Sequence, residues 1–86
     1  MYGISVMTEL TGVQPQALRD YETKGLLSPF RTAGGTRRYS QQDVERVHAV
    51  TGLLAEGANL VSVRRILELE EEVGRLTAEL ERYRSR

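Results

Sequence analysis

The sequence has no cysteine and only one histidine, His48, among its 86 residues. The absence of cysteine excludes disulfides, thiolate metal sites and thiol redox switches. One histidine cannot build a metal site, so we expect no metal and no other cofactor, and a structural or neutral role for His48. No acid/base pair, nucleophile motif or phosphate-binding loop can be assigned, which argues against an enzyme. A chain this short forms one small domain with a limited core, so we expect it to associate with a partner.

Long hydrophobic runs are also missing. No apolar stretch approaches the length of a membrane span, and the first residues, "MYGISVMTEL", lack the basic start and apolar core of a signal peptide. We therefore expect a cytoplasmic protein without a membrane partner.

Net charge is zero, with 12 basic and 12 acidic residues, so the total charge argues neither for nor against a polyanionic partner. The distribution is uneven. Between Glu22 and Asp43 the chain has no acidic residue, and the basic residues of that stretch are Lys24, Arg31, Arg37 and Arg38. Its centre, "RTAGGTRRYS", combines three arginines with adjacent glycines, and we expect these arginines to have no acidic neighbour.

Two short helices are predicted near the N-terminus. Ser5 can cap the first, and Gly12 can take the left-handed conformation that ends it. Pro15 suits the first position of the second helix, which Gly25 ends. The apolar positions at helical spacing are Val6, Met7, Leu10, Leu18 and Tyr21. This pattern is typical of a helix-turn-helix, although any helical hairpin could produce it.

The next segment predicts a two-stranded hairpin. "LLSPFR" reads as an edge strand that tolerates Pro29, and "TRRYS" can return after a turn at Gly34 and Gly35. Paired glycines allow positive φ and close approach to another surface, and arginines suit phosphate oxygens. The hairpin is thus predicted to be a wing with a cationic tip that contacts a phosphate backbone. The alternative is an ordinary solvated turn.

A third helix is expected after Ser40, which forms a capping box with Asp43. Gly57 ends this helix, and Asn59 caps the next one. The positions of the third helix that we expect to face the core are Val44, Val47, Val50 and Leu54.

The last helix has an apolar stripe that advances in alternating steps of three and four residues, as in a heptad seam. The stripe consists of Ile66, Leu69, Val73, Leu76, Leu80 and Tyr83. It predicts pairing with a second helix, and the charged flanking positions fit either a parallel or an antiparallel pair. An amphipathic helix packed on its own domain is the alternative. We therefore divide the chain into a DNA-binding domain over residues 1–58 and a dimerisation helix over 59–86.

Two longer motifs carry a family resemblance. "ALRDYETKGLLSPFR", followed by "GGTRRYSQQDVERV", resembles the DNA-binding domain of the MerR family of bacterial transcription regulators. Within that family, "SPFRTAGGTRRYS" and "GANLVSVRRILELE" are most similar to the heat-shock repressor (HspR) branch. The resemblance implies a mainly α fold: a winged helix-turn-helix with a two-stranded β-hairpin wing and a C-terminal dimerisation helix.

The resemblance also implies a function. The chain would be a homodimer that binds an inverted repeat in double-stranded DNA, and the heat-shock branch would make it a repressor. Gln14, Gln16 and Arg19, at the start of the second helix, would meet base edges in the major groove. Residues that would grip phosphates or the minor groove are Tyr21, Arg31, Arg37, Arg38 and Tyr39. A protein co-regulator or the abundance of the protein itself could supply the signal, because the cysteines of metal sensors and the large domain of drug sensors are absent.

Some positions depart from the family pattern. Many members have Thr-Leu-Arg where this chain has Ala17-Leu18-Arg19, and a tyrosine often precedes the wing arginine where Thr36 stands here. One or two phosphate contacts usual in the family are therefore in doubt. Two other functions stay open at this point: an architectural protein like the phage excisionases, and a coiled-coil interaction module that binds no nucleic acid.

Overall fold

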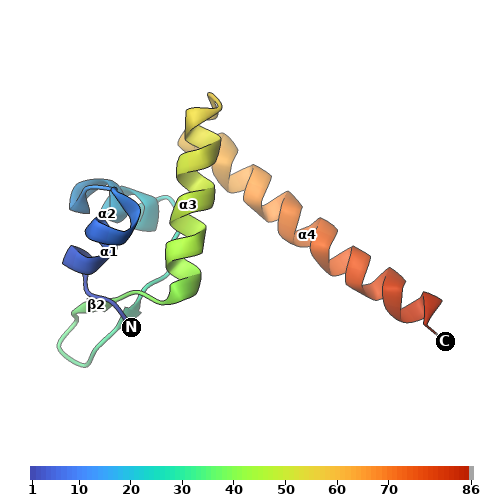
Figure 1. The fold of residues 1–86 in the computed structure, drawn as a ribbon, viewed down its shortest axis with the longest axis horizontal. Helices are drawn as coiled ribbons and strands as arrows, with labels where there is room; N and C mark the ends of the chain where they lie inside the picture. The colour runs from blue at the N-terminus through green and yellow to red at the C-terminus, as the bar shows by residue number, and fades with distance from the viewer. Residues whose placement is uncertain (86) are drawn as a thin grey trace.

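The computed structural model describes residues 1–85, so the last residue of the predicted 59–86 segment lies outside the described residues. Within this range the elements before residue 59 form a helical head, and the last helix forms one long arm (Figure 1). Its elements in order are α1 (Ile4–Thr11), α2 (Pro15–Thr23), β1 (Phe30–Arg31), β2 (Arg37–Arg38), α3 (Gln41–Ala55) and α4 (Leu60–Arg84). The mainly α fold with a two-stranded wing and a long C-terminal helix is confirmed.

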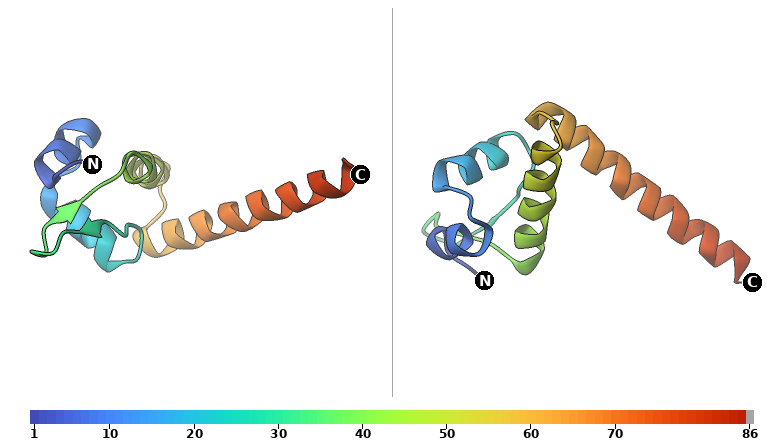
Figure 2. Two further views of the ribbon diagram at one scale, coloured as in Figure 1. Left: turned by 90° about the horizontal axis from the view of Figure 1, so that it is seen from below. Right: turned by 45° about the horizontal axis from the view of Figure 1, so that its top comes forward.

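One hydrophobic cluster holds the head together. Met7 of α1, Leu18 of α2, and Val47 and Val50 of α3 are completely buried in it, together with Val63 from the first turns of α4. The arm then leaves the head in every view, and the ribbon of its C-terminal half runs away from the other described elements (Figure 2). The predicted core positions of α3 are buried except Leu54, which is half-buried.

The start of α1 differs from the prediction. Its N-cap is Gly3 rather than Ser5, and no side chain caps the helix. The cause is a backbone pairing at Tyr2, whose N–H donates to the Tyr39 carbonyl over 2.7 Å while the Tyr39 N–H returns a bond of 2.8 Å. This bridge fixes the chain just before the helix. The helix therefore begins at Ile4, two residues earlier than a cap at Ser5 would predict. Of the apolar residues expected to face inward, Met7 does, whereas Val6 and Leu10 are exposed.

Helix α2 begins and ends as expected. Pro15 occupies its first turn, and Leu18 and Tyr21 face the core. Gly12 ends α1 with a φ of 74°, and Gly25 follows α2 with a φ of 78°. Both glycines provide the left-handed conformation that other residues adopt only with strain.

The wing is shorter than the prediction. Leu26 and Leu27 are buried in the core instead of starting a strand, and the strands pair over two residues each, Phe30 with Arg38 and Arg31 with Arg37. Only Gly35 of the two glycines takes a positive φ, 83°. The arginines consequently lie on the strands, beside the turn over residues 32–36 rather than at its tip.

Helices α3 and α4 both have the caps expected of them. Ser40 and Asp43 form a reciprocal capping box at the start of α3. Asn59 accepts a hydrogen bond of 2.9 Å from the Ser62 N–H at the start of α4. Each cap satisfies amide groups that the first helical turn leaves without partners, which explains why both helices begin at these residues.

Two different faces of α4 are apolar. Val63 and Leu67 are buried against the head. The predicted seam lies on another face, where Ile66 is half-buried and its other members are 47–73% exposed: Leu69, Val73, Leu76, Leu80 and Tyr83. The head therefore does not cover the seam, contrary to the alternative in which one amphipathic helix packs on its own domain.

Candidate nucleic-acid interface

A groove of about 350 Å³ lies where α1, α2 and the wing meet. One side is formed by Gly3, Ile4 and Ser5 at the start of α1. Arg19 of α2 lies along it, and the wing contributes Gly35, Thr36, Arg37 and Arg38. The groove thus brings together one residue predicted to contact bases and two predicted to contact phosphates.

The groove suits an anion for two reasons. The N-terminus of α1 carries amide groups that no side chain caps, and such groups attract negative charge together with the helix dipole. Three arginines line the groove, and within residues 1–85 neither Arg19 nor Arg38 forms an ion pair. Sequence reasoning missed the α1 terminus, since Ser5 suggested a capped helix whose amides would already be satisfied.

Arg38 is held by contacts other than carboxylates. Its Nη1 donates to the Arg37 carbonyl over 3.3 Å, and the same atom lies 3.4 Å from the position that a Cβ on Gly3 would occupy. A Cβ at residue 3 would thus be in van der Waals contact with this guanidinium, so Gly3 and Arg38 are immediate neighbours in the groove.

The predicted base-reading residues extend from the N-cap of α2 to the middle of the helix. Gln14, Gln16 and Arg19 are exposed there. Gln16 donates from Nε2 to Asp20 Oδ1 over 3.1 Å, one turn further along the helix. Their contact with base edges stays a prediction, and exposure at the start of a helix is the geometry that such contact requires.

The two tyrosines assigned to the interface are core residues in this structure. Tyr21 is 6% exposed and Tyr39 is completely buried. Burial raises the pKa of both phenols. The Tyr39 hydroxyl has no hydrogen-bond partner within the described residues. A phosphate contact by either tyrosine stays a prediction, and for Tyr39 it would need the ring to leave the core.

The expectation that the wing arginines have no acidic neighbour is wrong. Glu22, in the last turn of α2, forms ion pairs with both Arg31 and Arg37. Burial alone would raise the pKa of the Glu22 carboxyl, but the hydrogen bonds and positive charges of the two arginines outweigh it and hold that pKa below its usual value. The charge pattern along the chain does not reveal these pairs, because Glu22 lies 9 and 15 residues from its two arginine partners.

Other kinds of site find no support in the described part of the chain. Residues 1–85 contain no group of three or more His, Asp or Glu side chains placed to hold a metal ion. Nor does any helix there have the length and apolar composition to cross a membrane.

Residues 2–70 match the sequence pattern of the MerR HTH family regulatory proteins. The chain belongs to the MerR family. This is a family of DNA-binding transcription regulators rather than enzymes. Its regulators bind promoter DNA, typically as dimers.

Individual relatives agree with this assignment. The chain is 49% identical over 79 residues to a heat shock protein, HspR, of Streptomyces coelicolor. The aligned residues cover 91% of this chain and 52% of HspR. Among solved structures it resembles the lead(II)-bound regulator PbrR691 of Ralstonia metallidurans, with a TM-score of 0.77, 25% identity, and coverage of 96% of this chain and 69% of the other. It also resembles HiNmlR, a MerR family regulator without a sensor domain, bound to promoter DNA, with a TM-score of 0.70, 27% identity, and coverage of 95% and 76%. The chain spans about half the length of the curated relative HspR.

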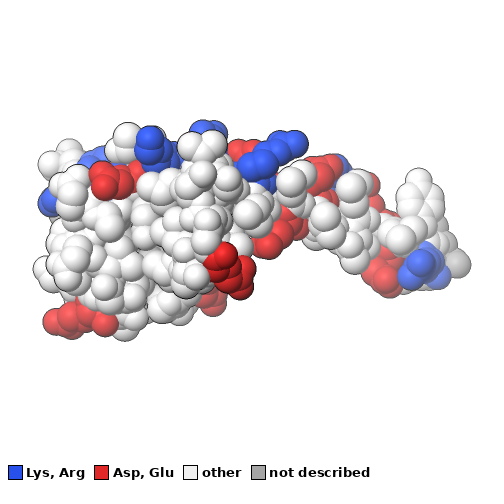
Figure 3. Space-filling model, turned by 90° about the horizontal axis from the view of Figure 1, so that it is seen from above, with Lys and Arg blue, Asp and Glu red and all other residues white. Residues whose placement is uncertain are grey.

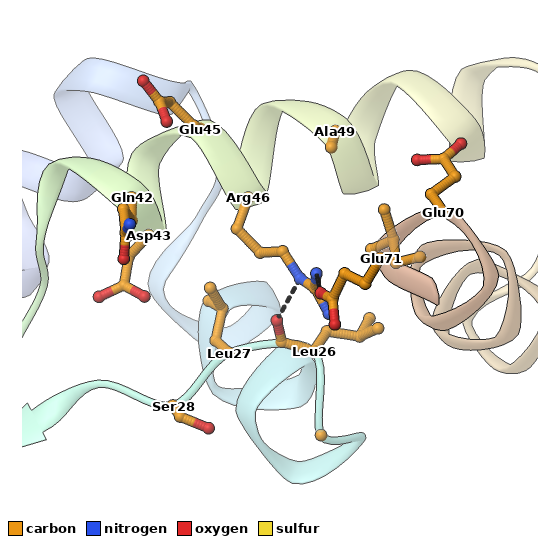
Figure 4. A pocket seen from close by; sticks show the side chains of 12 residues that line it. Leu26, Leu27, Ser28, Gln42, Asp43, Glu45, Arg46, Ala49, Glu70 and Glu71 are labelled. Carbon is orange, nitrogen blue, oxygen red and sulfur yellow. Dashed lines mark hydrogen bonds and ion pairs between the residues drawn. The ribbon is translucent and has the colours of Figure 1, made fainter. Parts of the chain in front are cut away.

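A second hollow, of about 670 Å³, separates α3 from α4 and the loop after α2 (Figure 4). Although it is larger than the groove at the wing, its charged lining is mostly acidic: Asp43, Glu45, Glu70 and Glu71, with Arg46. Phosphates would be repelled there. The smaller groove is therefore the better nucleic-acid site of this MerR family protein.

Proposed function

We propose that this MerR family protein is a homodimeric repressor that reads an inverted repeat. Each head would place the start of α2 in the major groove, with Gln14, Gln16 and Arg19 toward the bases. The wing and the α1 terminus would hold the adjacent backbone. The groove that joins Arg19, Arg38 and the uncapped end of α1 is the observation that carries this proposal.

The exposed seam of α4 supports the homodimer. Charged side chains of both signs flank the apolar residues along the arm (Figure 3). A helix of 25 residues with an uncovered apolar stripe is stabilised when a second copy covers it. Two heads held at a fixed spacing match two half-sites, which is why an inverted repeat is the expected target.

Repression rests on similarity to HspR, which is one of the relatives. Because the chain has no cysteine that could sense a metal, we propose a protein co-regulator as the source of the signal. A regulator of genomic DNA acts where that DNA is, so we propose a cytoplasmic, nucleoid-associated location. Membership of a family of DNA-binding regulators leaves no observation in favour of the excisionase-like or interaction-module alternatives.

Selection of bound fragments from the native genome, followed by footprinting and transcription in vitro, tests the proposal. We expect a protected inverted repeat that overlaps a promoter, and less transcript when protein is added. The matched control is the same repeat with one half-site scrambled, which should bind far more weakly because only one head can engage. Equal affinity for both DNAs would refute the dimeric reading, and an increase in transcript would refute repression.

A further inference from the structure

Glu22 connects the second helix to both strands of the wing. Its Oε2 accepts a hydrogen bond of 2.6 Å from Arg37 Nε, and its Oε1 accepts one from Arg31 Nη2. Arg31 and Arg37 are direct partners across the two strands. One carboxylate on α2 therefore holds both sides of the hairpin.

The wing has little else to fix its angle. Its strands pair over two residues each, and a two-stranded ribbon of that length is not stable alone. At its base the backbone bridge between Tyr2 and Tyr39 holds the end of β2. The Tyr39 ring, which directly follows β2, is buried in the core as well. The Glu22 contact is a further attachment, on the side that faces α2.

The three wing arginines therefore have different surroundings. Arg31 and Arg37 donate to Glu22, and Arg31 Nη1 also approaches the Gly35 carbonyl at 3.4 Å. Arg38 has no carboxylate partner within residues 1–85 and lines the groove with Arg19. A phosphate could pair with Arg38 directly, whereas for the other two it would have to displace charge-assisted bonds that already exist.

We propose that Glu22 is a positioning residue that sets the angle between the wing and α2 through Arg31 and Arg37, while Arg38 and Arg19 make the phosphate and base contacts. The inference rests on the proposed DNA interface. A wing that is already placed loses less freedom when DNA binds, so the bridge raises affinity without touching DNA.

Replacing Glu22 by glutamine gives opposite results under the two possible roles. The change removes one negative charge per protomer beside the DNA, so a purely electrostatic role predicts tighter binding. A positioning role predicts weaker binding, and we expect affinity for the paired site to fall about tenfold. Glu9→Gln is the matched control, because it removes the same charge. Glu9 is exposed on α1 and has no ion pair within residues 1–85. We expect Glu9→Gln to leave affinity unchanged or slightly higher.

Single arginine variants separate positioning from phosphate contact. We expect Arg38→Gln to reduce the salt dependence of binding by close to one unit of slope per protomer. Arg37→Gln should weaken binding with little change in slope. Combining it with Glu22→Gln should cost hardly more than Glu22→Gln alone, because that change already breaks the contact between Glu22 and Arg37. Additive losses, or a slope change for Arg37→Gln equal to that for Arg38→Gln, would overturn the proposal. So would a Glu22→Gln protein that binds as well as Glu9→Gln.

Measurements on the free protein keep the outcome clear. Hydrogen exchange at the amides of residues 32–36 should be faster in Glu22→Gln than in wild type, because the wing has lost an attachment. If Glu22→Gln fails to fold by circular dichroism, Glu22→Asp replaces it; this variant keeps the charge, shortens the reach, and should bind more weakly at an unchanged salt slope. Wild-type affinity in Glu22→Asp would then refute the inference. Failure of wild type to bind genomic DNA would refute the proposed function instead, whatever the exchange rates show.

Discussion

The Arg46 guanidinium of α3 lies 2.6 Å from Glu71 Oε1 of α4, where the arm leaves the head. Its Nε donates at the same time to the Leu26 carbonyl over 3.1 Å (Figure 4). One side chain thus joins the loop after α2, the middle of α3 and the first half of α4. The Arg46 side chain is 27% exposed and that of Glu71 is 67% exposed, so the two ends of this connection differ in their access to water.

The two bonds of Arg46 should differ in strength. The bond to the Leu26 carbonyl is partly buried, and its loss leaves a main-chain acceptor without its partner, so we expect Arg46→Met to lower the free energy of unfolding by about 1–2 kcal/mol. Glu71→Gln removes only an exposed ion pair and should lower it by less than about 0.5 kcal/mol. Urea unfolding at low and high salt measures both. Equal losses would show that the ion pair, and not the carbonyl bond, dominates.

Gly25 follows α2, lies beside Arg64 of the arm, and allows a second stability test. It has a φ of 78°, and a Cβ placed there would lie 3.3 Å from Arg64 Cζ. Gly25→Ala is therefore strained in its backbone and crowded by the arm, and we expect it to destabilise the fold by about 1–2 kcal/mol. The control is Gly52→Ala inside α3, where a Cβ meets nothing within 4 Å; it should stabilise the helix by about 0.5–1 kcal/mol. Thermal melts that shift in the same direction for both variants would contradict this explanation.

Local signals predicted the elements well, because each of those signals acts within a few residues. Pro15 and the Ser40 capping box mark helix starts through groups one turn away, and the apolar period of the last helix is a property of that helix alone. The start of α1 was missed because it depends on a partner outside the helix. Tyr2 pairs with Tyr39, and no pattern around Ser5 reveals that bridge.

The site was harder to predict than the fold for the same reason. The sequence placed Arg19 and the wing in one interface, and the structure does bring them to one groove. The sequence could not reveal that the Glu22 carboxylate contacts both Arg31 and Arg37, because these partners are 9 and 15 residues away along the chain. Tyrosine occurs both at interfaces and in cores, so residue type alone does not distinguish a phosphate contact from the buried rings of Tyr21 and Tyr39.

Specificity should depend on Arg19. We expect Arg19→Ala to weaken binding to the genomic site by about 1–3 kcal/mol and to relax discrimination at one base position in each half-site. Competition titrations on a set of single-base variants measure both effects. An equal loss on the genomic site and on scrambled DNA would place Arg19 on a phosphate instead.

The Glu22 bridge should also make stability depend on pH. The bound arginines hold the pKa of Glu22 in the folded protein below its usual value, after outweighing burial, which alone would raise it. The ionised carboxylate thus stabilises the fold above the ordinary glutamate pKa, and this contribution is lost as pH falls through the lower, folded pKa. We expect the free energy of unfolding of wild type to exceed that of Glu22→Gln by about 1 kcal/mol near neutral pH. This difference should disappear in acid. A gap that persists at about pH 2–3 would mean that the charge of Glu22 is not its source.

The seam supports a test that links dimerisation to DNA binding. Leu76 lies near its middle and is 48% exposed in the single chain, so a substitution there disturbs the partner surface more than the head. Leu76→Lys would bury an ammonium group of each protomer at the dimer interface, with a large desolvation cost. We expect the dimer dissociation constant to rise about 100-fold or more, with unchanged helical content.

Ala78→Lys is the control for that substitution, because Ala78 is exposed on the same helix but lies off the stripe. It adds the same charge and should leave the dimer intact. A monomeric Leu76→Lys protein should lose the preference for two half-sites over one, since a single head can engage only one at a time. Sedimentation, combined with titrations on both DNAs, measures each step. A Leu76→Lys protein that stays dimeric would remove the seam from the interface, and a monomer that still prefers the inverted repeat as strongly as wild type would break the link between the arm and the paired site.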